Sequence, residues 1–222
     1  NGKLEDAIIK YKKILSSGQN PEASNGLALA LRDLGRGKDA INAVEAALKI
    51  KPKDPILLNS YGTILAVLGK HDEAIRSFTS SVSITPDYAE AWANLGLSLS
   101  RASDHVAAKQ ALTTALKLNP EMLPLYYQLG RILNELGDPL GAEKHFNIYL
   151  REKPDDAMAL NELGNAIFSQ GRFEDARDIY KRAICIRTDF LAALNNLGST
   201  LRRLADLDGA IRAYDSVIKL DP

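Results

Sequence analysis

A 34-residue repeat runs through the sequence and constrains the fold more than any other feature. One alanine column reads Ala40, Ala74, Ala108, Ala142, Ala176 and Ala210. Prolines keep the same period at Pro52, Pro86, Pro120, Pro154 and Pro222, with Thr188 in the missing place. Glycines keep it at Gly62, Gly96, Gly130, Gly164 and Gly198, with Ala28 in the first unit. Self-similarity at this period indicates an array of stacked structural units.

The columns divide the chain into six units and one half unit. The units are 21–54, 55–88, 89–122, 123–156, 157–190 and 191–222, and residues 1–20 resemble the second half of one more. We therefore expect residues 1–222 to form a single repeat array. Because the sequence begins inside a unit, we interpret it as a fragment of a longer protein.

Each unit is expected to form two helices. In unit 89–122, apolar and small residues at 92, 95, 96 and 99 follow the i, i+3, i+4, i+7 spacing of a helix face. Ser103 and Asp104 interrupt this pattern, a second stripe begins at Ala108, and Pro120 follows its end. The sequence thus predicts an all-α protein with about 13 helices and no strand.

The turns and the close contacts are also predicted. Gly69, Gly137 and Gly171 mark the turn inside a unit, where Ser103 and Ala205 stand in two others at a modest expected cost. Asp138 before Pro139 is typical of a helix N-cap.

Small residues are expected to let the paired helices approach. Gly96 and Ala108 would bring the two backbones together, and Leu99 and Leu112 would fill the remaining space. One such hairpin cannot bury its apolar face alone, so the units must stack.

These residues resemble the tetratricopeptide repeat. The pattern is carried by Trp92, Leu95-Gly96, Leu99, Ala108, Leu112 and Pro120, and again by Leu160, Leu163-Gly164, Ile167, Ala176 and Tyr180. The resemblance implies a right-handed α-α superhelix of about six and a half repeats, with the first helix of each pair lining a concave groove. Ala28, Thr188, Tyr149 and Val217 depart from the pattern, and the last two are expected to perturb local stacking.

Composition excludes several function classes. Lys plus Arg and Asp plus Glu both number 28, so no positive excess favours nucleic acid or a membrane surface. No apolar run approaches the ~18 residues of a membrane span. The lone Cys185 excludes an internal disulfide and a thiolate zinc cluster, and it stands in a polar column where we expect an exposed, unreactive thiol. We expect no cofactor and, by default, a cytoplasmic protein.

Catalytic and metal-binding patterns are missing from the sequence. His71, His105 and His145 lack the spacing of a helical metal pair, and we expect them on the solvated surface. No phosphate loop, nucleophile elbow or zinc-protease motif occurs. We therefore expect no enzyme activity within this chain.

Side-chain amides recur on the expected groove face of the first helices. The candidate peptide-binding amides are Asn25, Asn59, Asn94, Gln128, Asn161, Asn165, Asn195 and Asn196. Asn is unfavourable inside helices, so its recurrence needs a reason. One interpretation is a ladder that binds the backbone of an extended peptide, because an amide both donates and accepts. The other is a solvated surface inherited from a common ancestral repeat.

Further groove candidates carry apolar groups or charge. Tyr127, Met158 and Phe168 would form side-chain pockets, and Arg131 and Arg202 belong to a mixed-charge face that is most basic at its C-terminal end. If the ladder interpretation holds, Asn161, Asn165, Asn195 and Asn196 should be free of intramolecular partners. Replacing all four by Ala should then weaken peptide binding and barely change stability.

Three functions stay open. The leading hypothesis is a scaffold that binds a protein or peptide in the groove. The alternative is the substrate-recruiting arm of a modifying enzyme, because the triplets at 94–96 and 196–198 look like those of the O-linked N-acetylglucosamine transferase family. The third is a homodimer through an end face that includes Leu197, Leu201, Tyr214 and Val217. A two-carboxylate clamp of the family type is rejected, since its lysines are missing.

Overall fold

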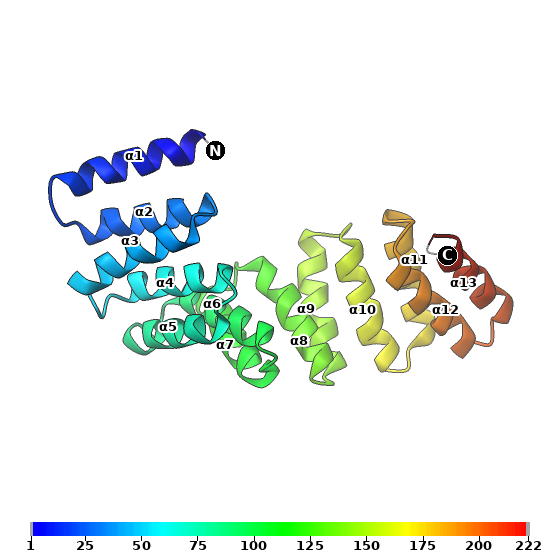
Figure 1. Ribbon diagram of the computed structural model, residues 1–222. Coiled ribbons are helices and arrows are strands. Elements are labelled where there is room, and N and C mark those ends of the chain that lie inside the picture. Colours follow the sequence, from blue (N-terminus) through cyan, green and yellow to red (C-terminus); the bar gives the residue numbers. More distant parts are fainter. Residues whose placement is uncertain (1, 221–222) are drawn as a thin grey trace. The chain divides into compact units, whose positions relative to one another are not determined.

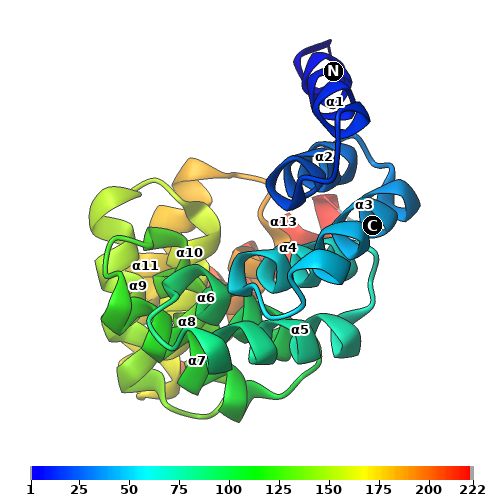
Figure 2. The same cartoon turned by 90° about the vertical axis from the view of Figure 1, so that its left-hand side faces the viewer.

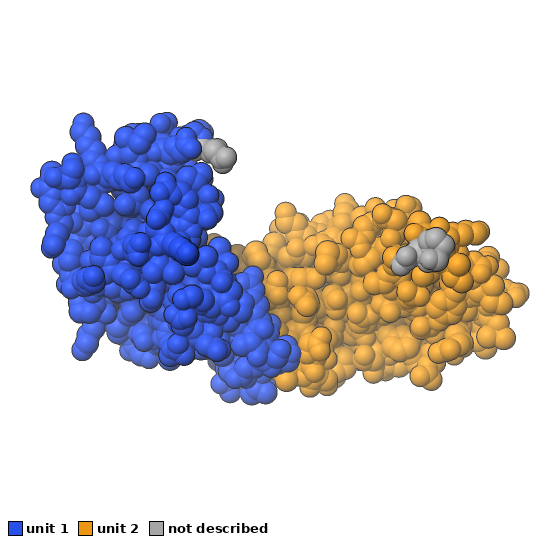
Figure 3. Space-filling view, viewed as in Figure 1, with its two compact units in different colours: residues 1–120 blue, residues 121–222 orange. Residues whose placement is uncertain are grey.

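The computed structural model describes residues 2–220, which form 13 α-helices and, within that range, no strand. Pro222, the last member of the proline column, lies outside the described residues. The all-α prediction and the repeat number are confirmed. The chain divides into two compact units, residues 1–120 and 121–222 (Figure 3), and each is described by itself.

The first unit is built from seven helices in chain order (Figures 1 and 2). They are α1 (Gly2–Ser16), α2 (Pro21–Asp33), α3 (Gly37–Ile50), α4 (Pro55–Val67), α5 (His71–Ile84), α6 (Ala89–Arg101) and α7 (His105–Leu118). Each helix contacts the next one in the chain, and α2 and α6 also contact α4. Since the described second helices α3, α5 and α7 make no such contacts among themselves, the layer of first helices is the concave one.

The second unit repeats the arrangement with six helices. They are α8 (Leu123–Glu135), α9 (Pro139–Glu152), α10 (Ala157–Ser169), α11 (Phe173–Ile186), α12 (Leu191–Arg203) and α13 (Leu207–Leu220). Here α10 contacts α8 and α12 across neighbouring repeats. These three first helices therefore form the concave layer of this unit.

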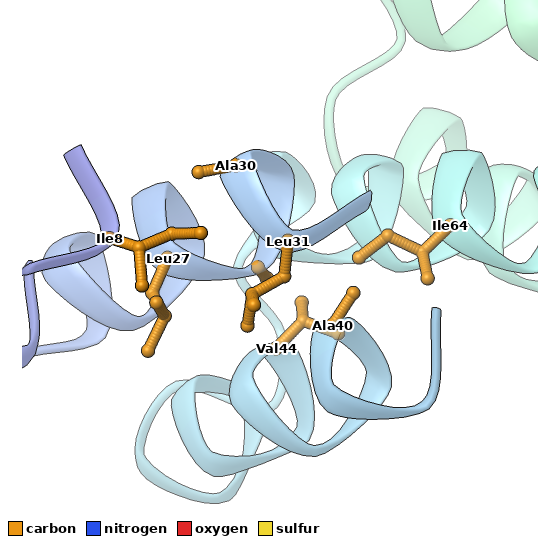
Figure 4. Close-up of a cluster of buried hydrophobic side chains, with 8 residues drawn as sticks. Ile8, Leu27, Ala30, Leu31, Ala40, Val44 and Ile64 are labelled. Atoms are coloured by element: carbon orange, nitrogen blue, oxygen red, sulfur yellow. The ribbon is translucent and has the colours of Figure 1, made fainter. Parts of the chain in front are cut away.

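Helix α1, the half repeat, is held by a core that it shares with the first full repeat. Figure 4 shows Ile8 of α1 with Leu27 and Leu31 of α2 and Val44 of α3, and all four side chains are buried. Ile64 of α4 extends the same cluster into the next repeat. Burying each large aliphatic side chain contributes about 1.5–3 kcal/mol, which stabilises the stacking of hairpins that could not fold alone.

Turn and cap chemistry follows the sequence. Gly69, Gly137 and Gly171 have φ of 77°, 70° and 77°, and Ser103 and Ala205 adopt the same left-handed conformation at 63° and 61°. The carboxylate of Asp138 accepts from the backbone N–H of Gly141 over 3.0 Å, which confirms the predicted N-cap. Asp54, Asp104 and Asp156 cap α4, α7 and α10 in the same way.

The glycine column faces a column of large side chains on the paired helix, which are aromatic except at Leu112. A Cβ on Gly62 would lie 2.5 Å from Phe78, and one on Gly164 would lie 2.4 Å from the ring of Tyr180. Ala28 takes the glycine place in the first full repeat, where the smaller Val44 replaces the aromatic residue. The larger Ala28 in the glycine column is thus compensated by the smaller Val44 on the paired helix.

Candidate functional site: a pocket and amide network on the second unit

Three asparagines of the second unit bind one another across neighbouring repeats. The amide of Asn196 on α12 donates to Oδ1 of Asn161 and to Oδ1 of Asn165 on α10, each over 2.9 Å. The Tyr180 hydroxyl of α11 donates to the same Asn165 oxygen over 2.8 Å. The expectation that these amides have no intramolecular partner is therefore wrong for all three.

The physical reason is the stacking of the first helices. Asn161 occupies the fifth position of its repeat and Asn196 the sixth of the next, and contact between α10 and α12 brings these positions together. Asn161 is only 5% exposed, so an unpaired amide there would carry a desolvation cost. Asn195, one residue from Asn196, is exposed and forms no hydrogen bond within the described residues.

The first unit contains the same pairing. Asn94 on α6 donates to Oδ1 of Asn59 on α4 over 2.9 Å, and Asn59 donates to the Tyr88 hydroxyl over 3.2 Å. Asn59 is buried rather than open to the groove. Asn25 occupies the position of Asn59 one repeat earlier, but its Oδ1 is buried without a hydrogen-bond donor among the described residues.

The amide network of the second unit keeps hydrogen-bonding groups that a ligand could use. Asn196 uses both amide hydrogens, which leaves its carbonyl oxygen able to accept. Asn165 has filled both acceptor positions of its oxygen, and its nitrogen donates to Glu162 over a long 3.4 Å. The nitrogen of Asn161 makes no hydrogen bond to the rest of the described chain. The network therefore presents both donors and an acceptor, held in fixed orientations.

A pocket of about 440 Å³ adjoins the network. Its lining combines amides, hydroxyls, an aromatic ring and cations: Asn165, Phe168, Ser169, Tyr180, Asn196, Ser199, Arg202 and Arg203. The Phe168 ring packs edge-on against Phe173, with ring centroids 5.1 Å apart. Burial, and to a lesser extent the nearby Glu162 charge, raises the pKa of Tyr180 far above its usual range. Tyr180 therefore stays a neutral donor near neutral pH.

Other sequence candidates lie elsewhere. Tyr127 packs against Phe146 and Tyr149 of α9, so its ring belongs to the hairpin core. Gln128 is half-buried and Arg131 is exposed on α8. Met158, 53% exposed, lines a separate hollow of about 660 Å³ next to the loop between α9 and α10.

The bulky Tyr149 has its own role in stacking. Its hydroxyl donates to the Asp156 carboxylate that caps the next helix, over 2.9 Å. A hydrogen bond from α9 to the N-cap of α10 thus accommodates the bulk of this residue.

The sequence reasoning missed Tyr180 as part of the site. The sequence held a signal for it: Tyr180 stands where Phe78 and Phe146 stand in other repeats. It follows Asn165, a polar residue of the first helix, by 15 residues. Tyr214 shows the same relation, because its hydroxyl lies 3.1 Å from that of Ser199. A buried hydroxyl needs a partner, so the pairing could have been read from the two columns.

The exposure of Cys185, of the histidines and of the end face was also predicted from the sequence. Cys185 is exposed as predicted. The histidines are half-buried rather than fully solvated, and Nδ1 of His145 contacts the Gly141 carbonyl oxygen at 2.7 Å. Leu197 and Leu201, expected on an open end face, are buried, whereas Leu207, Ile211, Ile218 and Leu220 of α13 are exposed.

Residues 2–220 contain neither a metal-binding cluster nor a membrane-spanning helix. No group of three or more His, Cys, Asp and Glu side chains is placed to hold a metal ion. None of the helices in this range is long and apolar enough to cross a bilayer.

Helical hairpins stacked at a fixed period define an α-helical repeat scaffold. Family models described as tetratricopeptide repeat match residues 1–55, 25–89, 62–122, 93–157, 127–190 and 191–222. The chain belongs to the tetratricopeptide repeat family. No curated protein matches it significantly in sequence. This fold supports a protein–protein interaction scaffold.

Several solved structures share the fold. The chain is similar to YrrB, described as a TPR protein with an unusual peptide-binding site, at 19% identity and a TM-score of 0.75, covering 81% of this chain and 93% of that one. It is similar to the C-terminal part of a TPR repeat-containing protein from Cytophaga hutchinsonii at 17% identity and a TM-score of 0.77, covering 99% and 91%. It also resembles MamA at 25% identity and a TM-score of 0.69, covering 76% and 92%.

Proposed function

We propose that the concave layer of the second unit binds an extended peptide segment of a partner protein. The pocket of about 440 Å³ beside the amide network carries this proposal. An extended peptide needs donors and acceptors for its backbone and a pocket for its side chains. The exposed Asn195 beside the pocket and Asn196 in its lining supply the first, and Phe168 supplies an apolar wall for the second.

The hydrogen bonds among the asparagines support this function instead of opposing it. The Asn196 side chain is already fixed by its bonds to Asn161 and Asn165, so it loses little rotamer freedom when a peptide arrives, which lowers the entropic cost of binding. The peptide-binding site described for YrrB is consistent with this use of the fold. In the first unit, Asn25 and Asn94 are the corresponding candidates, because Asn59 is buried. Gln128 and Arg131 extend the face of the second unit along α8.

Peptides selected from a random 12-residue display library on this chain test the proposal. We expect Phe168→Ala to weaken the selected peptide at least about five-fold, because a pocket aromatic at an interface contributes more than about 1 kcal/mol. Leu140→Ala is the matched control, since Leu140 is 69% exposed on the second helix α9. Equal affinities for the wild type and both variants would contradict peptide binding in the concave layer of the second unit.

We also propose self-association through α13. Leu207, Ile211 and Ile218 are 62%, 57% and 62% exposed and share one stripe of this helix. If a second copy of α13 packs antiparallel on this stripe, opposite charges beside the stripe face each other. That arrangement places Asp208 beside Lys219 of the other copy and Arg212 beside Asp215.

Sedimentation equilibrium tests the dimer. Ile211→Lys with Ile218→Lys should convert a dimer into a monomer, whereas lysines at the exposed Val106 and Leu140 should not. A wild-type chain that is monomeric across the whole concentration range would exclude this contact.

A further inference from the structure

We propose that Arg202 and Arg203 form a carboxylate site at the α12 end of the pocket, which takes an Asp or Glu side chain of the bound peptide. The inference rests on the proposed peptide-binding function and adds the chemical class of the partner. Both arginines line the pocket of about 440 Å³ and are exposed. Neither side chain forms an ion pair or a hydrogen bond within residues 2–220.

The pair Arg202 and Arg203 differs from the residues at the same positions of the first full repeat. Arg32 stands at the repeat position of Arg202, and Asp33 at that of Arg203. In that repeat Arg32 pairs with Asp33 at 2.7 Å and also donates to Thr63 of the next repeat over 3.1 Å. The later repeat replaces the neutralising aspartate by a second arginine. Arg202 and Arg203 are therefore adjacent in sequence, and no aspartate next to them takes the part that Asp33 has beside Arg32.

The surroundings favour a carboxylate over a diffuse cloud of counterions. The described lining of the pocket contains two arginines and no acidic residue, and Ser199 and Asn196 add polar groups. The acidic member of the network, Glu162, is engaged with Asn165 and is not part of the lining. Guanidinium groups bind carboxylates in a planar, two-point geometry, which gives direction as well as attraction.

The competing explanation is a helix-end effect. Cations in the last turn stabilise a helix by interacting with its C-terminal carbonyl groups. That role predicts a stability change when the arginines are neutralised and no change in peptide affinity. It also gives no reason for two arginines in a pocket, since α2 ends with one that is paired.

The test uses peptides from a random 12-residue display library selected on the intact chain. We expect Asp or Glu to be enriched at one peptide position. The Arg202→Gln, Arg203→Gln double variant should bind the best such peptide about ten-fold more weakly, as expected for losing two exposed ion pairs. The peptide with that acid changed to Asn or Gln should bind as weakly to the wild type and should not weaken further with the variant.

The matched control is Arg151→Gln with Arg182→Gln. These exposed arginines line a different pocket of the same unit, about 390 Å³, and the change in net charge is identical. The control should keep wild-type affinity, and circular dichroism should show both variants folded. Equal weakening by both variants would reduce the effect to overall charge and overturn the site.

Three other outcomes bear on this inference and on the proposed function. Peptides that bind the groove without acidic enrichment, and equally well to the arginine variant, would leave the proposed function standing and overturn the carboxylate site. A library that yields no binder would contradict both. Displacement of the selected peptide by a 12-nucleotide single strand at a lower concentration than by free peptide would assign the arginines to phosphates and also overturn the proposal.

Discussion

The side-chain amide of Asn196 donates to Oδ1 of Asn161, 35 residues earlier in the chain, over 2.9 Å. The first unit repeats this bond at the same spacing and distance between Asn94 and Asn59. A recurring amide pair between neighbouring first helices thus couples adjacent repeats. The same asparagines that suggest peptide binding are therefore also part of what holds the array together.

Asn196→Ala should lower the free energy of unfolding by about 1–3 kcal/mol, because two acceptors lose their donor and Asn161 is buried. Urea unfolding followed by circular dichroism measures this change. Asn195→Ala is the control on the same helix. Its amide is exposed and unpartnered, so the better helix propensity of Ala should leave stability unchanged or raise it slightly. Equal midpoints for the two variants would refute the coupling.

Asn25 and Asn59 should respond oppositely to alanine although they share a repeat position. Asn25→Ala removes a buried oxygen that has no donor, so we expect a gain of roughly 0.5–1 kcal/mol. Asn59→Ala removes bonds to Asn94 and Tyr88 and should cost about 1–2 kcal/mol. Thermal melts of both variants are sufficient. A loss at Asn25 as large as that at Asn59 would show that its oxygen is satisfied in solution.

Gly62 and Phe78 should show strong coupling in a double-mutant cycle. Gly62→Ala alone puts a methyl group 2.5 Å from the Phe78 ring, at a cost of about 1–3 kcal/mol. Phe78→Val alone leaves a cavity and should also be destabilising. The double variant recreates the Ala28 and Val44 pair of the first full repeat, so its loss should be clearly smaller than the sum. Simple additivity would contradict the packing explanation.

Ser103→Gly and Ala205→Gly should each raise stability by about 1 kcal/mol. Both residues hold a left-handed φ that costs an L-residue roughly 1–2 kcal/mol and costs glycine little. Gly137→Ala, at the equivalent turn with φ of 70°, should produce the opposite change. Differential scanning calorimetry gives the comparison, and destabilisation by glycine at 103 or 205 would be the contrary result.

The fold could be predicted from the sequence because each repeat position occurs in several units, so the residues at that position can be compared. Ala108, Gly96 and Asp138 act within one hairpin, and the local spacing of such residues determines helix, turn and cap. The column comparison even anticipated the strained turns at Ser103 and Ala205.

The site was only partly readable, for a physical reason. Whether Asn161 is free or bonded depends on how far α10 and α12 approach, which is a property of the packed stack rather than of one helix. The same holds for Tyr127, whose ring is taken up by Phe146 and Tyr149 of the neighbouring helix. Helix faces follow from periodicity, but the partners of a polar group follow from tertiary contact.

We propose the layer of α8, α10 and α12 as the peptide-binding surface. Amide chemical-shift mapping by NMR, with a display-selected peptide added to the labelled 24.2 kDa chain, tests it most directly. We expect the largest shifts at Phe168, Asn195, Asn196 and Ser199, with the second helices α9, α11 and α13 little affected. Shifts confined to those second helices, or to the hollow lined by Pro154, Met158 and Arg187, would contradict it.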